Sequence, residues 1–431
     1  MPKLRVVIFE DDTYENFLPL TYTRPAFDLR CGTRSFRHRM MDCIGAPDAL
    51  PFTRDYLAEY IESKERRPVN RPEEIVGTTL FVNGLLIPDR TLTSKLKRAS
   101  EGQIGVKDDR LVFICLGAVK AQEFAERLSR PLSGLDVSQL ERSATKKVDV
   151  QEAQLITYPQ ELIGLNVELL KFDLTSLKRS RAGKIHPRAT ISGRRGDLSI
   201  GSGSIVEAGA ELDVRTGPIH IGPNCMIQSN ASIGGPAFIG SGTQILPFAR
   251  IHGGSSIGDM CKIGGEVEAT VIHGHSDKAH AGFIGHSYVG EWVNLGAMTT
   301  TADSKNTYGT VKVNIRGQRI DTGETAIGAF IADYVKASIG VMIYPGNKIG
   351  VAAQLHGTVI GDVPSFAIYA RTLGSKLMES FFESVAEAQR RMYGRRKIEQ
   401  TAADITLLKR VFEITKDERK AAGVFQGRFS I

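Results

Sequence analysis

Isoleucine recurs every six residues through the middle of this chain. The eight positions are Ile221, Ile227, Ile233, Ile239, Ile245, Ile251, Ile257 and Ile263. Neither an α-helix nor an ordinary strand has a period of six, whereas a coil of three short strands joined by tight turns does. Each isoleucine then points into one stacked core, and the glycines that follow several of them permit the turns. The sequence therefore predicts a parallel β-helix of hexapeptide repeats.

The flanking sequence extends this solenoid and adds two further parts. The looser register includes Ile185, Ile191, Val206, Leu212, Phe283, Val289, Leu295, Ile343 and Ile349. We expect the solenoid to span residues 184–364, with residues 299–325 as a loop between coils. Residues 1–175 alternate apolar runs with helix-like segments, which predicts an α/β domain with a largely parallel, Rossmann-like sheet. Residues 373–431 predict C-terminal helices, with Leu377, Phe381 and Val385 sharing one helical face.

Composition narrows the functional class. The five cysteines are widely spaced and form no CxxC pair, which indicates reduced thiols and a cytoplasmic protein. No apolar stretch is long enough for a membrane span, so we expect no membrane partner. The net charge of +7 suits anionic substrates such as nucleotides. Because the basic runs lack interleaved aromatic residues, we do not expect a nucleic-acid partner.

Histidines concentrate where the repeat is interrupted. Four of the nine lie within fourteen residues: His273, His275, His280 and His286. A histidine acts as a general base near neutral pH, and a carboxylate on a neighbouring coil would orient it. Each histidine could equally fill a corner of the solenoid, and histidines from adjacent coils could bind zinc. The cluster predicts a site of one of these kinds.

Two stretches carry a family resemblance. Residues 17–25 read Phe-Leu-Pro-Leu-Thr-Tyr-Thr-Arg-Pro, and residues 285–297 read Gly-His-Ser-Tyr-Val-Gly-Glu-Trp-Val-Asn-Leu-Gly-Ala. With an α/β domain preceding a hexapeptide solenoid, the chain resembles a divergent bacterial branch of the bifunctional N-acetylglucosamine-1-phosphate uridylyltransferase and glucosamine-1-phosphate acetyltransferase family. The resemblance covers nearly all of residues 1–370. It implies a left-handed β-helix and a homotrimer with the acetyltransferase site between subunits.

The resemblance also implies roles for solenoid residues. In the family, the catalytic histidine lies fourteen residues before an asparagine in a Val-Asn-Ile-Gly-Ala stretch. Residues 293–297 match this stretch, which places the asparagine at Asn294 and the base at His280. The glutamate that orients the base falls on Glu268, with Glu266 in reserve. The implied substrate-binding residues are Arg250, which ends a Phe-Ala-Arg motif, together with His252, Phe283 and Asn294.

The sequence departs from the family at several of these positions. His252 replaces an arginine, Phe283 replaces a tyrosine, and Ala269-Thr270 stand in place of a lysine pair. These changes point to a sugar phosphate other than glucosamine 1-phosphate as the acetyl acceptor.

The N-terminal part lacks the Gly-rich triphosphate loop that usually follows the first strand of sugar nucleotidyltransferases. Glu10-Asp11-Asp12 occupy its place. A phosphate site could be rebuilt from the later residues Arg24, Arg30, Gly32 and Arg34. The candidate Mg²⁺ ligands are Asp11, Asp12 and Asp89, although acidic residues after a strand more often cap turns or helices.

Together these features predict a sugar-nucleotide enzyme. We expect it to transfer a nucleotidyl group from a nucleoside triphosphate to a sugar 1-phosphate with Mg²⁺, giving a product of the UDP-N-acetylglucosamine type. We also expect an acetyl transfer from acetyl coenzyme A, with His280 as base and Glu268 orienting it. Two alternatives stay open: a zinc-dependent β-helical lyase resembling γ-class carbonic anhydrases, and a sugar-nucleotide-binding protein without catalytic activity.

Overall fold

The structure is a computed structural model that describes residues 4–128, 135–427 and 429. It divides into two compact units, neither of which is one continuous stretch of chain. The first unit contains Met1–Leu29, Arg34–Tyr158 and Thr401–Arg410. The second contains Arg30–Thr33, Pro159–Gln400 and Val411–Ile431. Within the described ranges, no helix combines the length and the apolar character that a bilayer crossing requires.

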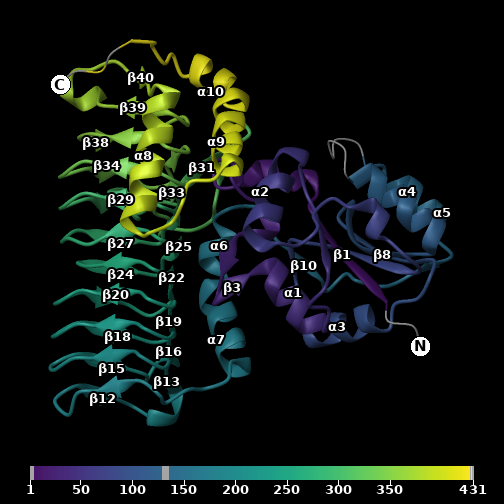
Figure 1. Ribbon diagram of the computed structural model, residues 1–431, viewed down its shortest axis with the longest axis horizontal. Coiled ribbons are helices and arrows are strands. Elements are labelled where there is room, and N and C mark those ends of the chain that lie inside the picture. Colours follow the sequence, from purple (N-terminus) through teal and green to yellow (C-terminus); the bar gives the residue numbers. More distant parts are fainter. Residues whose placement is uncertain (1–3, 129–134, 428, 430–431) are drawn as a thin grey trace. The chain divides into compact units, whose positions relative to one another are not determined.

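A six-stranded sheet forms the core of the first unit (Figure 1). In spatial order its strands are β4 (Leu50–Phe52), β1 (Arg5–Phe9), β5 (Thr79–Asn83), β8 (Arg110–Leu116), β7 (Gln103–Lys107) and β9 (Lys146–Lys147). The predicted apolar runs form β1, β5 and β8, which are almost entirely buried. Strand β8 is antiparallel to both β5 and β7. Asp108 and Asp109, both at positive φ, join β7 to β8 in a two-residue hairpin, which explains this departure from a parallel sheet.

Helices and short elements complete the first unit. They are η1 (Asp12–Phe17), η2 (Ala26–Asp28), β3 (Arg34–Ser35), α1 (Phe36–Ile44), α2 (Asp55–Glu65), η3 (Pro72–Glu74), β6 (Leu86–Ile87), α3 (Arg90–Lys97), α4 (Ala118–Leu128), α5 (Val137–Ser143) and β10 (Gln154–Leu155). Local sequence fixes several helix ends. Ser35 caps the start of α1, and Gly45 at φ 77° ends it in the left-handed conformation that glycine tolerates.

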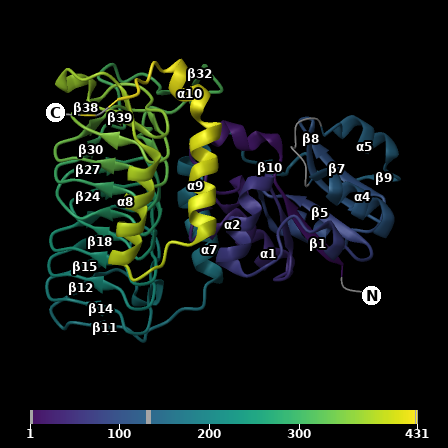
Figure 2. The same cartoon turned by 45° about the horizontal axis from the view of Figure 1, so that its top comes forward.

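The second unit is a parallel β-helix with three sides, which we call S1, S2 and S3 (Figures 1 and 2). S1 consists of β13 (Leu198–Ile200), β16 (Ile219–Ile221), β19 (Ala237–Ile239), β22 (Ser255–Asp259), β25 (Val271–Gly274), β28 (Tyr288–Glu291), β33 (Phe330–Ile331) and β36 (Lys348–Ile349). S2 consists of β11 (Lys184–Ile185), β14 (Ile205–Val206), β17 (Met226–Ile227), β20 (Gln244–Ile245), β23 (Lys262–Ile263), β26 (Asp277–Lys278), β29 (Asn294–Leu295), β34 (Lys336–Ala337), β37 (Gln354–Leu355), β39 (Ala367–Tyr369) and the antiparallel β40 (Met378–Glu379). S3 consists of β12 (Thr190–Ser192), β15 (Glu211–Asp213), β18 (Ser232–Gly234), β21 (Arg250–Ile251), β24 (Glu266–Glu268) and β27 (Phe283–Gly285), followed by the separate sheet β30 (Thr300–Thr301), β35 (Met342–Ile343) and β38 (Thr358–Val359).

The hexapeptide isoleucines form the solenoid core as predicted. All eight belong to one buried apolar cluster and are at most 1% exposed. Two positions near the histidines differ from the expected pattern. Ile284 fills the core where the sequence predicts Phe283, whose side chain is only half-buried. Lys278 pairs with Ile263 and takes the core position of its coil.

The register explains both differences. A coil of three hexapeptides contains 18 residues, and Ala237 accordingly pairs with Ser255 on the next coil. Ser256 pairs with Val271, three residues short of a full coil. Val271 pairs with Tyr288, one residue short. The histidine-rich segment therefore lies on coils whose length has slipped out of the hexapeptide period.

The predicted loop after residue 299 carries its own hairpin, β31 (Lys312–Ile315) and β32 (Gln318–Asp321). The remaining elements are β2 (Arg30–Cys31), α6 (Glu161–Gly164), α7 (Asn166–Ser176), η4 (Arg195–Asp197), η5 (Arg371–Leu373), α8 (Phe382–Arg395), α9 (Ala402–Ile414) and α10 (Lys416–Ala421). The predicted helical face at Leu377 and Phe381 is wrong, because β40 pairs with β39 and α8 starts only at Phe382. The predicted fold class, an α/β part followed by a β-helix and C-terminal helices, is confirmed.

Helix α8 lies along the solenoid in both ribbon views (Figures 1 and 2). Trp292 stacks on His275 and contacts the tilted ring of Tyr393 of α8, at centroid distances of 4.4 and 4.5 Å. The Tyr393 hydroxyl contacts the buried Tyr334 hydroxyl at 3.0 Å, and Arg396 pairs with Asp277 at 2.7 Å. These contacts fix α8 to the coils that carry the histidines.

Replacing Tyr393 with phenylalanine should lower the free energy of unfolding by about 1–3 kcal/mol, because the buried Tyr334 hydroxyl loses its partner. Urea unfolding followed by the fluorescence of Trp292, the single tryptophan, measures the change. The exposed Tyr308→Phe serves as a control. An unchanged midpoint in Tyr393→Phe would show that this hydroxyl pair does not stabilise the fold.

Candidate functional site

Four predicted solenoid residues lie on neighbouring strands at the outer surface of S3. Arg250 pairs in register with Glu266, and Glu266 pairs with Phe283. Glu268 pairs with Gly285 of the same strand as Phe283. Alternate residues of these strands point inward, where Ile251, Val267 and Ile284 are buried. The structure thus brings Arg250, Glu268 and Phe283 onto one face, with the adjoining His252 at its edge.

His280 lies at the turn between β26 and β27, which we call the S2–S3 corner. Its side chain is exposed. The corner is stacked between two others: the Glu266 amide donates to the Gly282 carbonyl, and the Met298 amide donates to the Ala281 carbonyl. Beneath it, the Lys278 ammonium donates to the carbonyls of Gly264 and His280 at 2.7 and 2.9 Å. The main chain at His280 is therefore held from both sides while its imidazole faces outward.

Two other histidines of this region pair with carboxylates. His252 Nε2 lies 2.7 Å from Glu266 Oε1. His286 Nδ1 lies 2.8 Å from Asp303 Oδ2, and this bond lowers the pKa of Asp303. The Asp303 carboxylate and the Phe283 ring both lie over Gly285, where a Cβ would overlap them. Sequence reasoning did not identify Asp303, because it lies in the loop between coils.

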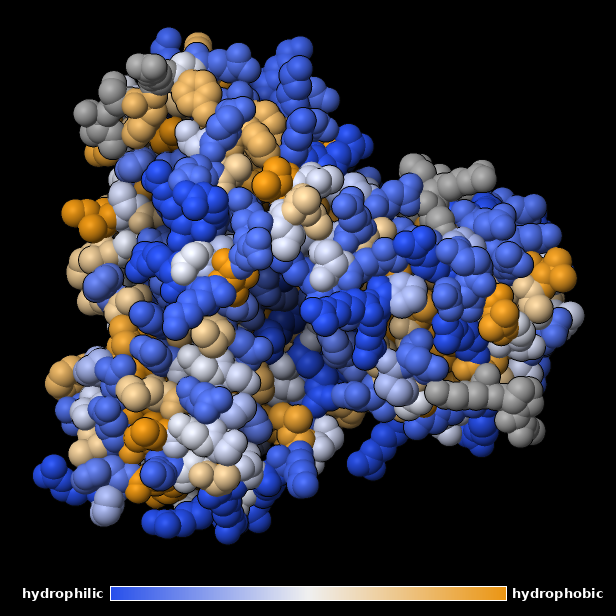
Figure 3. Space-filling view, in the orientation of Figure 1, coloured by the Kyte–Doolittle hydropathy of each residue, from blue (hydrophilic) through white to orange (hydrophobic). Residues whose placement is uncertain are grey.

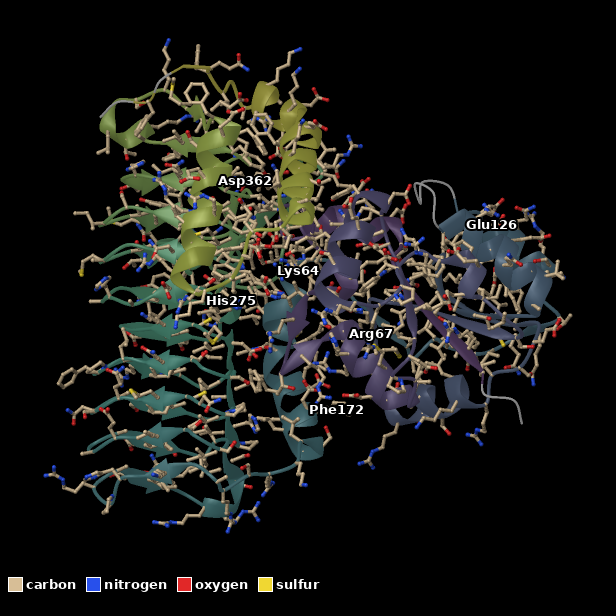
Figure 4. The ribbon with its side chains drawn as sticks, viewed as in Figure 1. Lys64, Arg67, Glu126, Phe172, His275 and Asp362 are labelled. Atoms are coloured by element: carbon tan, nitrogen blue, oxygen red, sulfur yellow. The ribbon has the colours of Figure 1, made fainter. Side chains whose placement is uncertain are left out.

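The remaining two histidines of the cluster have structural contacts. His273 is buried, and its Nε2 accepts the amide hydrogen of Arg30 at 3.1 Å. His275, labelled on the solenoid in Figure 4, stacks on Trp292, and burial lowers its pKa. These two residues match the structural interpretation of solenoid histidines. Asn294 lies on S2, exposed, and is in register with Asp277 and Lys336.

A pocket of about 190 Å³ opens at the carboxyl end of β1 in the first unit. Its polar lining consists of Glu10, Asp11, Asp12, Asp109 and Arg110. Arg110 donates to Asp11 Oδ2 at 3.0 Å and to the Ile156 carbonyl at 3.1 Å. Asn83, at the end of β5, donates to the same Asp11 oxygen at 2.8 Å. Ligands of α/β sheets bind at this edge, so the pocket occupies the expected position for a substrate.

A buried ion pair organises the segment next to this pocket. Glu10 accepts hydrogen bonds from Arg54 at 3.0 Å, from Thr53 at 2.7 Å and from the Ala26 amide at 2.6 Å. Arg54 also donates to the carbonyls of Thr21 and Arg24 at 2.7 and 2.9 Å. Residues 17–25, one of the stretches that carry the family resemblance, are therefore held by Arg54, which in turn is held by Glu10, the first residue after β1.

The four residues of the predicted phosphate loop do not belong to one unit. Arg24 and Arg34 lie in the first unit, where Arg34 pairs with Asp42. Arg30 and Gly32 lie in the second unit. The Arg30 amide donates to Tyr288 as well as to His273, and the Gly32 amide donates to Asn166 Oδ1 at 2.6 Å. The Arg30 guanidinium lies 5.5 Å above the Phe238 ring.

The predicted metal ligands have protein contacts. Asp11 caps η1 through the Thr13 amide at 3.1 Å, in addition to its bonds with Arg110 and Asn83. Asp89 caps α3 through the Leu92 amide at 2.7 Å, and Asp12 is exposed. In the described part of the chain, no three His, Cys, Asp or Glu side chains gather as a metal site requires. These carboxylates do not form a ready magnesium site, and their metal role stays a prediction.

Comparison with known proteins finds a family match for the N-terminal part of the chain. Residues 6–182 match the family model described as sugar nucleotidyl transferase. Relatives that are named as bifunctional proteins also match. A bifunctional sugar-1-phosphate nucleotidylyltransferase/acetyltransferase of Sulfurisphaera tokodaii is 41% identical over 102 residues, which are 23% of this chain and 25% of that protein. The bifunctional protein GlmU of Cupriavidus pinatubonensis is 28% identical over 199 residues, 40% of this chain and 43% of that protein. The predicted resemblance is confirmed, and the matches span less than half the length of these relatives.

Among solved structures, the chain is similar to the UDP-N-acetylglucosamine acyltransferases of Francisella novicida and Campylobacter jejuni. The first is 15% identical, with a TM-score of 0.26, and the alignment covers 57% of this chain and 87% of that one. The second is 13% identical, with a TM-score of 0.20, and the alignment covers 56% and 83%.

Proposed function

We propose that this protein is a sugar-nucleotide transferase with two reaction sites, one in each unit. The match of residues 6–182 to the sugar nucleotidyl transferase family model carries the proposal. The bifunctional nucleotidylyltransferase/acetyltransferase relative supports a second, acyl-transferring site on the solenoid. The five free cysteines are consistent with a reducing, cytoplasmic location.

In the first unit, a sugar 1-phosphate oxygen attacks the α-phosphate of a nucleoside triphosphate, and pyrophosphate leaves. We place this reaction at the pocket beyond β1, where Arg110 would stabilise the negative charge that develops on the phosphates. Asp11 and the Ile156 carbonyl orient Arg110. Mg²⁺ would enter bound to the triphosphate, and Arg110 is the cationic residue of a polar lining whose other members are the acidic residues Glu10, Asp11, Asp12 and Asp109. Arg24, Arg30, Gly32 and Arg34 stay candidates for phosphate binding.

On the solenoid, an amine or hydroxyl of a sugar phosphate attacks the thioester carbonyl of acetyl coenzyme A. His280 accepts the proton, and the coenzyme A thiolate leaves and is protonated. Glu268 would orient the imidazole, while Arg250, His252, Phe283 and Asn294 would bind substrate. The exposed imidazole and its fixed main chain suit this role.

A second copy of the chain would complete this site. Large apolar residues line the S2–S3 corner on both sides of His280: Phe248 is 75%, Met298 60% and Ile339 79% exposed. Apolar side chains also appear along the left edge of the solenoid in Figure 3. Such a stripe favours an interface between subunits, and the resemblance implies a homotrimer. Sedimentation of the purified protein tests this assembly.

Replacing Arg110 with glutamine should reduce pyrophosphate release by about 10²-fold, because a charge-stabilising donor is lost from the pocket. The assay uses UTP or dTTP, Mg²⁺ and a panel of hexose and hexosamine 1-phosphates. The control is Arg98→Gln, because Arg98 is an exposed arginine at the C-cap of α3 that contacts Ser94. Absence of pyrophosphate with every pair of substrates would reject nucleotidyl transfer and favour a binding protein.

A further inference from the structure

Lysine is out of place at position 278. The S2 core column includes Val206, Ile227, Ile245, Ile263, Lys278, Leu295, Ala337 and Leu355, which successive strands bring into register. Every other member is apolar. Lys278 is 3% exposed, although a buried ammonium loses its hydration. A residue that violates the pattern of its own fold usually has a functional reason.

The contacts of Lys278 identify what it holds. Its ammonium donates to the Gly264 carbonyl on the preceding coil and to the His280 carbonyl on its own coil. Both carbonyls belong to S2–S3 corners that stack directly on each other. The coil that leads from Ile263 to its partner Lys278 is shorter than three hexapeptides, so the two corners differ in length. The Lys278 ammonium bridges the two corners from inside the solenoid. Burial lowers the pKa of Lys278 to about 8.

We propose that Lys278 is a positioning residue, which anchors the His280 corner from inside the core and so fixes the base of acyl transfer. This inference rests on the proposed acyl transfer at His280. Lys278 does not contact substrate; it acts through the main chain of His280. The structure retains a buried amine here because an aliphatic residue would leave both corner carbonyls without this donor.

Lys278→Met tests the proposal, because methionine is unbranched, of similar length and apolar like the rest of the column. With acetyl coenzyme A and a panel of amino-sugar phosphates, we expect kcat to fall about tenfold with KM nearly unchanged. Hydrogen exchange at the amides of Glu266 and Met298, which donate to this corner, should become faster. The melting temperature should change little, because the removed desolvation cost of an ammonium offsets the loss of its bonds to the two carbonyls.

The control is Lys348→Met, because burial also lowers the pKa of Lys348. Lys348 lies on the last strand of S1, away from the His280 corner, and its main-chain amide donates to Asp362. It should leave kcat and the exchange at Glu266 and Met298 unchanged. An unaltered kcat in Lys278→Met, or a fall in melting temperature together with kcat, would overturn the positioning role. A wild-type protein that is inactive with every acceptor would instead reject the proposed acyl transfer, and unaltered exchange in Lys278→Met would then reject the anchor as well.

Discussion

Replacing His280 with alanine is expected to lower acyl transfer by about 10²- to 10⁴-fold, the usual contribution of a general base. The imidazole is exposed at the S2–S3 corner, so its removal leaves no cavity and the melting temperature should not change. The rate of coenzyme A thiol release, measured with a panel of amino-sugar phosphates, reports the effect. Glu268→Gln should show a smaller loss, because Glu268 only orients the base.

His186→Ala is the matched control, since His186 is an exposed solenoid histidine far from this corner in the sequence. His286, which pairs with Asp303, is the alternative candidate for the general base. Its Nδ1 is held by Asp303, and a histidine held in this way presents its other nitrogen as a proton acceptor. Full activity in His280→Ala, combined with a loss in His286→Ala, would transfer the role of base to the His286–Asp303 pair.

The second large effect concerns the stability of the first unit. Replacing Arg54 with methionine should lower its free energy of unfolding by about 3–5 kcal/mol, the usual cost of leaving a buried charge without its partner. The side chain of Glu10 is 0% exposed and that of Arg54 is 8% exposed. Urea unfolding measured by circular dichroism reports the change.

Arg71→Met is the comparison, because Arg71 pairs with Glu62 at the surface, where an ion pair contributes little. Arg54→Met should also loosen residues 17–25, whose carbonyls Arg54 binds, and proteolysis within that segment would detect this change. Equal unfolding midpoints for the two variants would show that the Glu10–Arg54 pair does not stabilise the unit.

The fold was largely predictable because its dominant signal is periodic. An aliphatic residue at every sixth position leaves only one architecture, and each isoleucine of the block is buried where the period places it. The prediction failed where the coils become shorter: Ile284 replaced Phe283 in the core, and Lys278 took an aliphatic position. The interruption of the period after Ile263 is visible in the sequence, but only the pairing of distant strands reveals how many residues each coil has lost.

The candidate sites were less predictable for a related reason. His280 and Glu268 came from a motif, and the structure places them on neighbouring coils of one solenoid. Motifs identify residues, but they do not identify partners such as Asp303, which comes from a loop, or Arg110, which comes from another strand. The phosphate residues Arg24 and Arg30 are close in sequence, yet their tertiary contacts assign them to different units.

The division of the chain between the units affects the order in which they form during synthesis. Residues 401–410 belong to the first unit and supply Asp404, which is buried and pairs with Lys64 of α2 at 2.8 Å; Figure 4 labels Lys64. When the ribosome has completed residues 1–158, that helical turn does not yet exist. The unit that is translated first therefore reaches its final structure only after the whole solenoid has emerged. A nascent chain of this kind exposes an unfinished surface throughout most of its synthesis, which is the period when chaperones act.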